Sequence, residues 1–170
     1  MYRHVRRLQE SFTAVERCRA PVVCAIQGAC FGGGVDLAAA CDVRVCSKDA
    51  VFCVKEIDLA IVADIGTLQR LPKLIGHGRA LEMALTARAV DADEAFRVGL
   101  ATSVLESPSE LQRNAFALAV QAQAPLTLSI LLVLSTFYRG VAVALVLTVY
   151  LLASFSMGPS QFKEAHLQGA

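Results

Sequence analysis

The sequence predicts a single domain of mixed α/β structure, and three observations support this. Its 170 residues are enough for one domain, and 55% of them are hydrophobic with a net charge of only +1, as expected of a globular chain. Apolar runs of strand length alternate with segments of helical periodicity. No internal repeat or low-complexity segment breaks this alternation. Because the net charge is so small, no nucleic-acid partner is expected.

The first expected elements are a helix, a strand and a second, short helix. The opening helix is amphipathic, and Pro21 follows its end. The segment "VVCAIQG", residues 22–28, is typical of a buried strand, and a short helix is expected after the glycines at 32–34. The basic start "MYRHVRRLQESF" would also suit a transit peptide, but its apolar residues continue at helical spacing into the domain. They are Val5, Leu8, Phe12 and Val15.

The remaining core is expected to alternate between strands and helices. Asp91 is a candidate N-cap for one of these helices, with further acids in the first turn. The expected strands are "DVRVCS" (42–47), "AVFCVKE" (50–56) and "LATSVLE" (100–106). The expected helices are "GTLQRLPKLIG" (66–76), "RALEMALTA" (79–87), "DADEAFRVG" (91–99) and "SELQRNAFALAVQAQ" (109–123).

The cysteines predict reduced thiols in the core. All six lie between Cys18 and Cys53, with no C-x-x-C pair and no histidine at zinc-ligand spacing. Neither a disulfide framework nor a metal site is indicated, so no metal is expected. A reducing compartment fits this usage of cysteine.

Three consecutive glycines stand where a strand should give way to a helix, in "CAIQGACFGGGVDLAAACD", residues 24–42. Neither phosphate-binding pattern, G-x-x-x-x-G-K-[ST] or G-x-G-x-x-G, is met. Two interpretations remain. The run is either a tight strand-to-helix bend, or a place where a ligand approaches backbone N–H groups at a helix N-terminus, which favours a developing oxyanion.

Three acids in one short region are the candidate catalytic groups: Asp36, Glu56 and Asp64. Asp64 is flanked by apolar residues, and if its carboxyl points inward its pKa should rise, which suits proton transfer near neutral pH. Alternatively, Asp64 is a solvated loop acid or caps a helix at Thr67 and Leu68. Spacing alone does not show which acids converge.

Two long segments resemble the enoyl-CoA hydratase/isomerase (crotonase) superfamily, especially its Δ3,5-Δ2,4-dienoyl-CoA isomerases. They are "QGACFGGGVDLAAACDVRVCSKDAVFCVKEIDLAIVADIGTLQRLPKLIG" (27–76) and "LTARAVDADEAFRVGLATSVLE" (85–106). The resemblance implies a crotonase-like spiral of ββα units, N-terminally truncated, with C-terminal helices. Residues 1–125 would form a partial crotonase core, with the strands at 22–26, 43–46 and 51–54 in one sheet.

The resemblance also implies roles for the glycines and the acids. Gly33, between Gly32 and Gly34, would donate a backbone N–H to the thioester oxygen of an acyl-CoA. Asp36 and Glu56 fall where hydratases carry their two catalytic glutamates, and Asp64 would be an additional acid further along the acyl chain.

The implied reaction converts a 3,5-dienoyl-CoA to a 2,4-dienoyl-CoA in fatty acid β-oxidation. Glu56 would act as base at C2, Asp64 as acid at C6, and Asp36 as a polar neighbour that orients them. Coenzyme A would be part of the substrate, and no separate cofactor is expected. The alternatives are an enoyl-CoA hydratase-like enzyme, or an inactive truncated subunit that acts by assembly or membrane association.

The C-terminal region 126–170 departs from the family pattern, because residues 126–157 contain one charged residue, Arg139, and 140–157 contain none. The expected structure is either apolar helices buried in a homotrimer or hexamer, or a membrane anchor at 140–157. The family suggests a mitochondrial or peroxisomal location, although the chain does not end in S-K-L.

Overall fold

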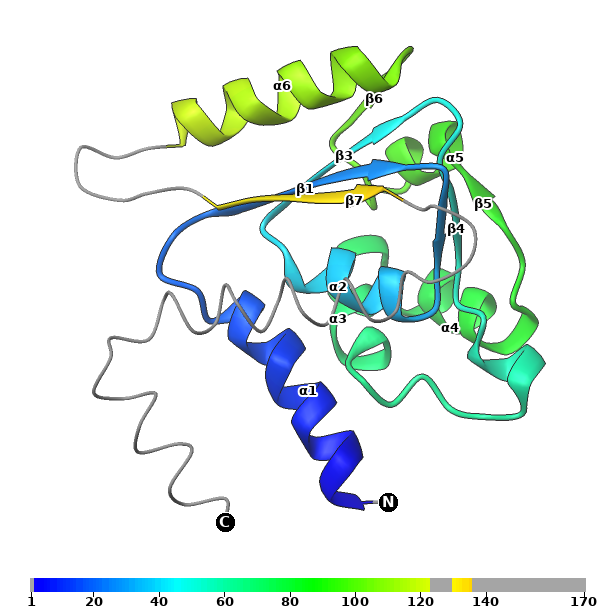
Figure 1. Cartoon of the computed structure of the whole chain (residues 1–170). Helices are drawn as coiled ribbons and strands as arrows, with labels where there is room; N and C mark the ends of the chain where they lie inside the picture. Colours follow the sequence, from blue (N-terminus) through cyan, green and yellow to red (C-terminus); the bar gives the residue numbers. More distant parts are fainter. Residues whose placement is uncertain (1, 123–129, 136–170) are drawn as a thin grey trace, which may run out of the picture.

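The structure is a computed structural model that describes residues 2–122 and 130–135, with side chains described for residues 5–122. Helices and strands alternate along the described chain (Figure 1). The helices are α1 (Tyr2–Glu16), α2 (Gly33–Ala40), the 3-10 helix η1 (Glu56–Leu59), α3 (Thr67–Ile75), α4 (His77–Thr86), α5 (Ala92–Arg97) and α6 (Pro108–Gln121). The strands are β1 (Val22–Gln27), β2 (Ala29–Phe31), β3 (Val43–Ser47), β4 (Val51–Cys53), β5 (Val90–Asp91), β6 (Ser103–Leu105) and β7 (Ile130–Ser135).

The main sheet is entirely parallel, in the order β6-β3-β1-β7. Strand β1 lies inside it and is buried on both faces, as its continuous apolar sequence predicts. Val23 and Ala25 contact one small core with α6, whereas Cys24 and Ile26 point to the larger core that includes α1 and α2. Figure 1 shows α6 on one side of this sheet and α1, α2 and α3 on the other.

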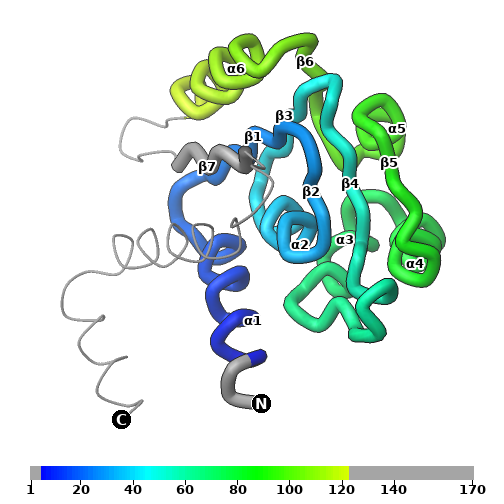
Figure 2. Tube along the Cα trace, turned by 45° about the vertical axis from the view of Figure 1, so that its right-hand side comes forward, coloured from blue at the N-terminus to red at the C-terminus, as the bar shows by residue number. Residues whose placement is uncertain are grey.

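A second sheet, in the order β2-β4-β5, lies beside α4 and α5 (Figure 2). β2 and β4 are parallel, and β4 and β5 are antiparallel. The expectation that 51–54 shares one sheet with 22–26 and 43–46 is therefore wrong. The chain bends at Gly28, whose carbonyl accepts from Val51 N, so β2 continues away from β1 and pairs with β4 instead.

The predicted helix over the C-terminal region is wrong for residues 130–135, which form β7. This strand runs parallel to β1, with Val22 opposite Ile130 and Gln27 opposite Ser135. A short apolar run such as "ILLVLS" fits a buried strand as well as a helix, and here the free edge of β1 decides in favour of the strand. The other residues of 126–170, including 140–157, lie outside the described residues.

The main helix predictions are confirmed, and two of the helices begin at polar caps, of which that of α5 was predicted. Asp91 accepts from Glu94 N at 2.7 Å at the start of α5, as predicted, and Ser107 accepts from Glu110 N at 3.3 Å at the start of α6. The sequence did not predict β2, β5 or η1 as separate elements. None of the helices in the described part of the chain combines the length and apolar character needed to cross a bilayer.

All six cysteines are unpaired, which confirms the prediction of free thiols, and all except Cys18 are buried. Burial raises the pKa of the Cys30 thiol well above its usual range and that of Cys46 to about 11. The Cys41 thiol donates to the carbonyl of Leu37 at 3.2 Å. These thiols act as small apolar core residues.

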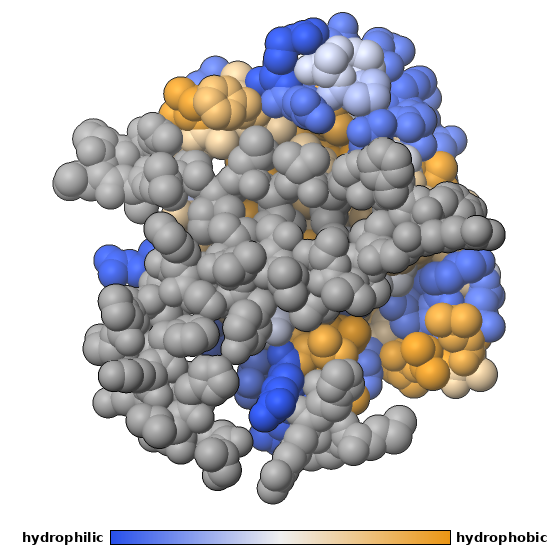
Figure 3. Space-filling model, in the orientation of Figure 1, coloured by the Kyte–Doolittle hydropathy of each residue, from blue (hydrophilic) through white to orange (hydrophobic). Residues whose placement is uncertain are grey.

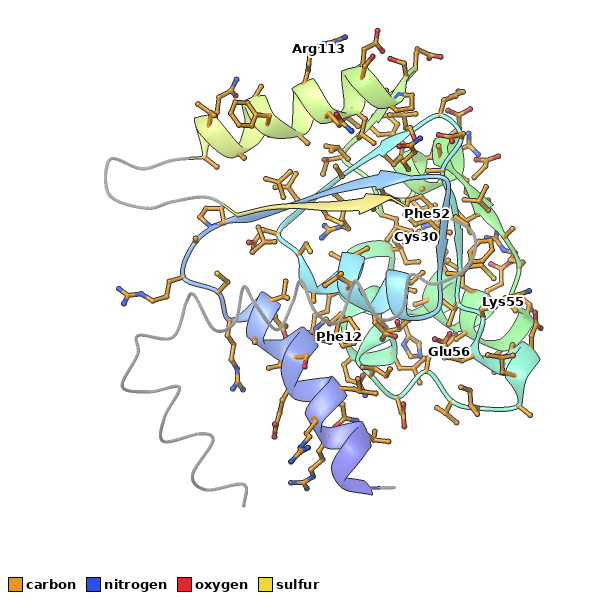
Figure 4. The ribbon with its side chains drawn as sticks, in the orientation of Figure 1. Phe12, Cys30, Phe52, Lys55, Glu56 and Arg113 are labelled. Atoms are coloured by element: carbon orange, nitrogen blue, oxygen red, sulfur yellow. The ribbon has the colours of Figure 1, made fainter. Side chains whose placement is uncertain are left out.

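Phe52 of β4 is fully buried in the larger core (Figure 4). Its replacement therefore tests how much this core contributes to the free energy of unfolding. Phe52→Ala should lower the free energy of unfolding by about 3–5 kcal/mol, because it leaves a cavity between the second sheet and its helices. Phe116→Ala is the matched control, since Phe116 on α6 is 64% exposed and its loss should change stability by no more than about 0.5 kcal/mol. Urea unfolding would measure both, and equal effects would contradict this assignment of the core.

Candidate active site

The three candidate acids follow the glycine run on two helices and one loop. Asp36 is in the first turn of α2, Glu56 opens η1 just after β4, and Asp64 is in the loop before α3. In Figure 4, Glu56 lies below the ends of β2 and β4. Burial raises the pKa of the Asp36 and Glu56 carboxyls; the charge of Asp64 adds to both increases, and the charge of Asp36 adds to that of Glu56. The three carboxylates therefore lie close enough to influence one another.

Asp36 is fully buried and is held by the start of α3. Its Oδ1 accepts hydrogen bonds from Thr67 N at 2.6 Å and Thr67 Oγ1 at 2.7 Å. Burial raises the pKa of the Asp36 carboxyl, and the two bonds from Thr67 and the charge of Arg70 offset only part of this increase. Its second oxygen, Oδ2, is buried and has no hydrogen-bond partner among the described residues.

Glu56 is half-buried, and its carboxylate also has an unsatisfied oxygen. Oε2 is buried and has no hydrogen-bond partner in the described structure. Burial raises the pKa of the Glu56 carboxyl, and the neighbouring negative charges add to this effect. Buried polar atoms are normally satisfied, so free oxygens on two neighbouring acids are typical of groups that bind or react.

Gly32 explains part of the glycine run. Its N–H donates to Cys53 O at 2.9 Å, its φ is +50°, and a Cβ atom there would lie 2.9 Å from Oε1 of Glu56. A larger residue at this position would be strained and would displace the carboxylate. Gly32 therefore allows Glu56 to lie directly against the backbone that leads into α2.

Gly33 is the first residue of α2, so its N–H lies outside the ladder of intrahelical bonds. The N–H groups of Val35 and Asp36 both donate to Gly32 O. A Cβ atom at Gly33 would meet nothing within 4 Å, whereas one at Gly34 would lie 3.4 Å from the Cys30 sulfur. Of the two positions, Gly33 is the one with open space beside the helix N-terminus.

Asp64 is exposed, so of its alternative interpretations the solvated loop acid is confirmed and the inward-pointing carboxyl is wrong. The apolar neighbour Val62 is itself 67% exposed, so an apolar flank did not indicate burial here. Nor does Asp64 cap α3 at Thr67, since Asp36 takes that place. Its backbone is nevertheless fixed: Asp64 N donates to Val62 O at 2.8 Å, and Asp64 O accepts from Gln9 Nε2 at 2.6 Å.

Two residues of the site were missed by the sequence analysis, Thr67 and Arg70. Both lie in the "GTLQRLP" segment, which was interpreted only as a helix start. Thr67 was considered as a partner for Asp64, three residues away, rather than for Asp36 on another helix. Arg70 is 8% exposed, and such a buried cation on an amphipathic helix is the signal that could have marked it.

The described residues contain no group of three or more His, Cys, Asp or Glu side chains arranged to hold a metal ion. The candidate site consists of the carboxylates of Asp36, Glu56 and Asp64 together with the N-termini of α2 and α3. These groups can exchange protons and stabilise a negative oxygen.

Residues 3–165 match the family described as enoyl-CoA hydratase/isomerase. The chain belongs to this family. Similar solved structures of the family's fold include "Structural of Pseudomonas aeruginosa DspI" (TM-score 0.70, 35% identity, covering 73% of this chain and 48% of that one). Another is an enoyl-CoA hydratase from Bacillus anthracis (TM-score 0.68, 38% identity, covering 71% and 47%). The predicted crotonase-like fold is confirmed.

Curated relatives within the enoyl-CoA hydratase/isomerase family include Δ(3,5)-Δ(2,4)-dienoyl-CoA isomerases. The peroxisomal protein of Arabidopsis thaliana is 54% identical over 117 residues, 69% of this chain and 42% of that protein. The mitochondrial protein of Rattus norvegicus is 50% identical over 116 residues, 68% of this chain and 36% of that protein. The chain thus spans about two fifths of the length of these relatives, and the predicted resemblance to dienoyl-CoA isomerases is confirmed.

The buried Asp36 predicts a pH-dependent stability. Because burial raises its pKa in the folded state, the protonated acid is favoured on folding, and stability is lost as the pH rises from about 4, its unfolded pKa, through the folded value. Asp36→Asn keeps an oxygen for Thr67 and removes the charge. It should therefore raise Tm at neutral pH, by about 2–4 °C for each kcal/mol recovered, and have no effect below about pH 4.

Thermal unfolding followed by circular dichroism between acid and neutral pH would measure this difference. Asp64→Asn is the matched control, because that side chain is exposed and its replacement should change stability by no more than about 0.5 kcal/mol. An Asp36→Asn protein that loses stability at neutral pH would show that the charge of Asp36 stabilises the fold.

Proposed function

We propose that this chain carries the acid–base groups of a Δ3,5-Δ2,4-dienoyl-CoA isomerase. One observation carries the proposal: three mutually interacting carboxylates lie beside an open helix N-terminus, and Asp64 supplies one acid more than a hydratase needs. The names of relatives at about half identity support the same reaction. The substrate class would be acyl-CoA thioesters with double bonds at C3 and C5, which are conjugated with each other but not with the thioester carbonyl.

In the proposed reaction, Glu56 removes a proton from C2 of a 3,5-dienoyl-CoA. The electrons of that C–H bond pass into the conjugated system and give an extended enolate with its negative charge on the thioester oxygen. Asp64 then donates a proton to C6, and the double bonds come to lie at C2 and C4. One proton leaves and one is added, so no oxidant, reductant or metal is required.

The surroundings of Glu56 support its role as the base. Burial and two neighbouring acids raise its pKa toward the pH at which the reaction would run, which is the best range for proton transfer in both directions. The exposure of Asp64 in this chain would let it meet a long acyl chain and exchange its proton with water. Asp36 would orient both, because its Oδ1 is fixed by Thr67 while its Oδ2 is buried and has no hydrogen-bond partner in the described structure.

Gly33 would contribute a backbone N–H to the oxyanion of the thioester, flanked by Gly32 and Gly34. The proposal is supported by the open space at Gly33 and by its position as the first residue of α2. The partial positive charge of a helix N-terminus favours the enolate over the neutral thioester. This interaction would strengthen as negative charge develops during the reaction.

The proposed activity is tested by adding 3,5-dienoyl-CoA to the protein in D₂O. Formation of a diene conjugated with the thioester is followed by its ultraviolet absorbance, and deuterium at C2 and C6 by mass spectrometry. Hydration of a 2-enoyl-CoA is measured in parallel. Water addition without isomerisation would favour the hydratase alternative, and neither reaction would favour the inactive subunit.

Two variants separate the roles of the acids. Glu56→Gln should lower both isomerisation and C2 exchange by about 10²–10⁴-fold, because the base is lost. Asp64→Asn should lower isomerisation by a similar factor while C2 exchange continues, because the enolate still forms. Asp58→Asn is the matched control, since Asp58 lies between them in sequence but pairs with Lys55 on the surface. Full isomerisation by Asp64→Asn would remove Asp64 from the mechanism.

We further propose that the protein functions as a trimer or hexamer in a mitochondrion or peroxisome. The compartments are those named for its relatives. Support for association comes from exposed apolar side chains on η1 and the following loop, visible at the lower right of Figure 3. They are Ile57, Leu59, Ile61 and Val62, exposed by 46%, 68%, 56% and 67%.

Covering such side chains in an oligomer would recover about 25 cal/mol for each Å² of apolar surface removed from water. Light scattering of the detergent-free protein should therefore give a mass three or six times that of one chain. Ile61→Asp, which places a charge within this group, should shift the mass toward the monomer. A wild-type protein that stays monomeric at all concentrations would contradict the proposal.

A further inference from the structure

Arg70 of α3 is a buried cation whose hydrogen bonds lead to another helix and to the Asp64 loop. Its side chain is 8% exposed. Its guanidinium donates to Glu16 Oε2 at 3.1 and 2.8 Å and to Thr13 Oγ1 at 3.1 Å, both on α1. A third nitrogen reaches the carbonyl of Ile65 at 3.5 Å. Arg70 thus connects α1 to the residue that follows Asp64.

The loop is shaped to admit this guanidinium. Gly66 has φ +142°, and a Cβ atom at this position would lie 1.7 Å from Nη1 of Arg70. Any other residue would be strained at this φ and would displace the end of the Arg70 side chain, so glycine suits both the turn and the position of the arginine. The backbone N–H of Arg70 also donates to Gly66 O at 3.1 Å, which closes the first turn of α3.

A second residue of α1 holds the same loop directly. Gln9 Nε2 donates to the backbone carbonyl of Asp64 at 2.6 Å. The hydrogen bonds of Gln9 and Arg70 therefore end on consecutive carbonyls, those of Asp64 and Ile65. On the other side, Thr67 is bound to Asp36 of α2. The loop between residues 64 and 67 is thus fixed from α1 and from α2 at once.

We propose that Arg70 and Gln9 are positioning residues that use α1 to fix the carboxylate of Asp64 relative to Glu56. This rests on the proposed function, because it concerns the proton that Asp64 would deliver to C6. An exposed side chain on a loop would otherwise sample many positions, and a displacement of about 1 Å at a reacting group can cost about 10²-fold in rate. Neither residue is a catalytic group, since each acts through the backbone of the loop.

The first test compares Arg70→Gln with Arg88→Gln. Arg88 is the control, because it also forms ion pairs with glutamate side chains, but its partners Glu82 and Glu94 lie on α4 and α5 rather than on α1. In the Arg70 variant, amide hydrogen exchange at residues 62–67 should become about tenfold faster while exchange in β1 is unchanged, because only the loop is released. The Arg88 variant should leave residues 62–67 as in wild type.

The second readout is the ratio of isomerisation to C2 proton exchange. Arg70→Gln should lower isomerisation by at least about tenfold with little change in C2 exchange or KM, because Glu56 remains in place while Asp64 does not. Loss of folded protein would lower both reactions equally and leave the ratio unchanged. Arg70→Lys keeps the charge without the forked geometry, so full recovery by lysine would show that the charge alone matters.

Gln9→Ala keeps the test decisive if Arg70→Gln does not fold. It should change the same ratio in the same direction, whereas Ser11→Ala, whose hydroxyl bonds only Arg7 O within α1, should not. Unchanged loop exchange and an unchanged ratio in both the Arg70 and Gln9 variants would overturn the inference. A wild-type protein without turnover would instead reject the proposed function, and the amide-exchange comparison would still decide whether Arg70 and Gln9 hold the loop.

Discussion

The arrangement of the site depends on the two hydrogen bonds that Thr67 donates to the buried carboxylate of Asp36. They join α2, the helix after the glycine run, to α3, the helix after the Asp64 loop. They therefore fix the position of the Asp64 loop relative to α2. The same acid satisfies an N–H at the start of α3, which would otherwise be buried without a partner. One carboxylate oxygen thus has a structural role, while the other is buried without a hydrogen-bond partner in the described structure.

Such an arrangement is costly for the fold and useful for proton transfer. A buried carboxylate with one satisfied oxygen destabilises the folded state more than an apolar residue of similar size would. Gly32 also has a low helical preference, and its lack of a Cβ atom allows the Glu56 carboxylate to lie against the backbone before α2. Local features that oppose stability tend to gather where a protein binds or reacts, and here they lie at the candidate active site.

Apolar periodicity and local caps were sufficient to predict most elements, including β1, β3, α6 and the Asp91 cap of α5. These features depend on residues close together in sequence. The second sheet could not be predicted in the same way, because β2 has only three residues and its partner is decided by the bend at Gly28. The bond between Asp36 and Thr67 joins residues 31 positions apart, and no local pattern specifies it. The orientation of Asp64 could not be predicted from its apolar neighbours, because Val62 is exposed whereas Ala63 is buried.

The pairing of β7 with β1 has a consequence for the order of folding. Val22 lies opposite Ile130, so β1 pairs on this edge with a strand that is synthesised more than a hundred residues later. Closing so large a loop is slow, because chain entropy is lost before any contact compensates for it. Until then β1 presents an apolar edge that can pair with strands of other chains. A nascent chain of this protein would therefore be most prone to aggregation between the synthesis of α6 and that of β7, the interval in which a chaperone would be most useful.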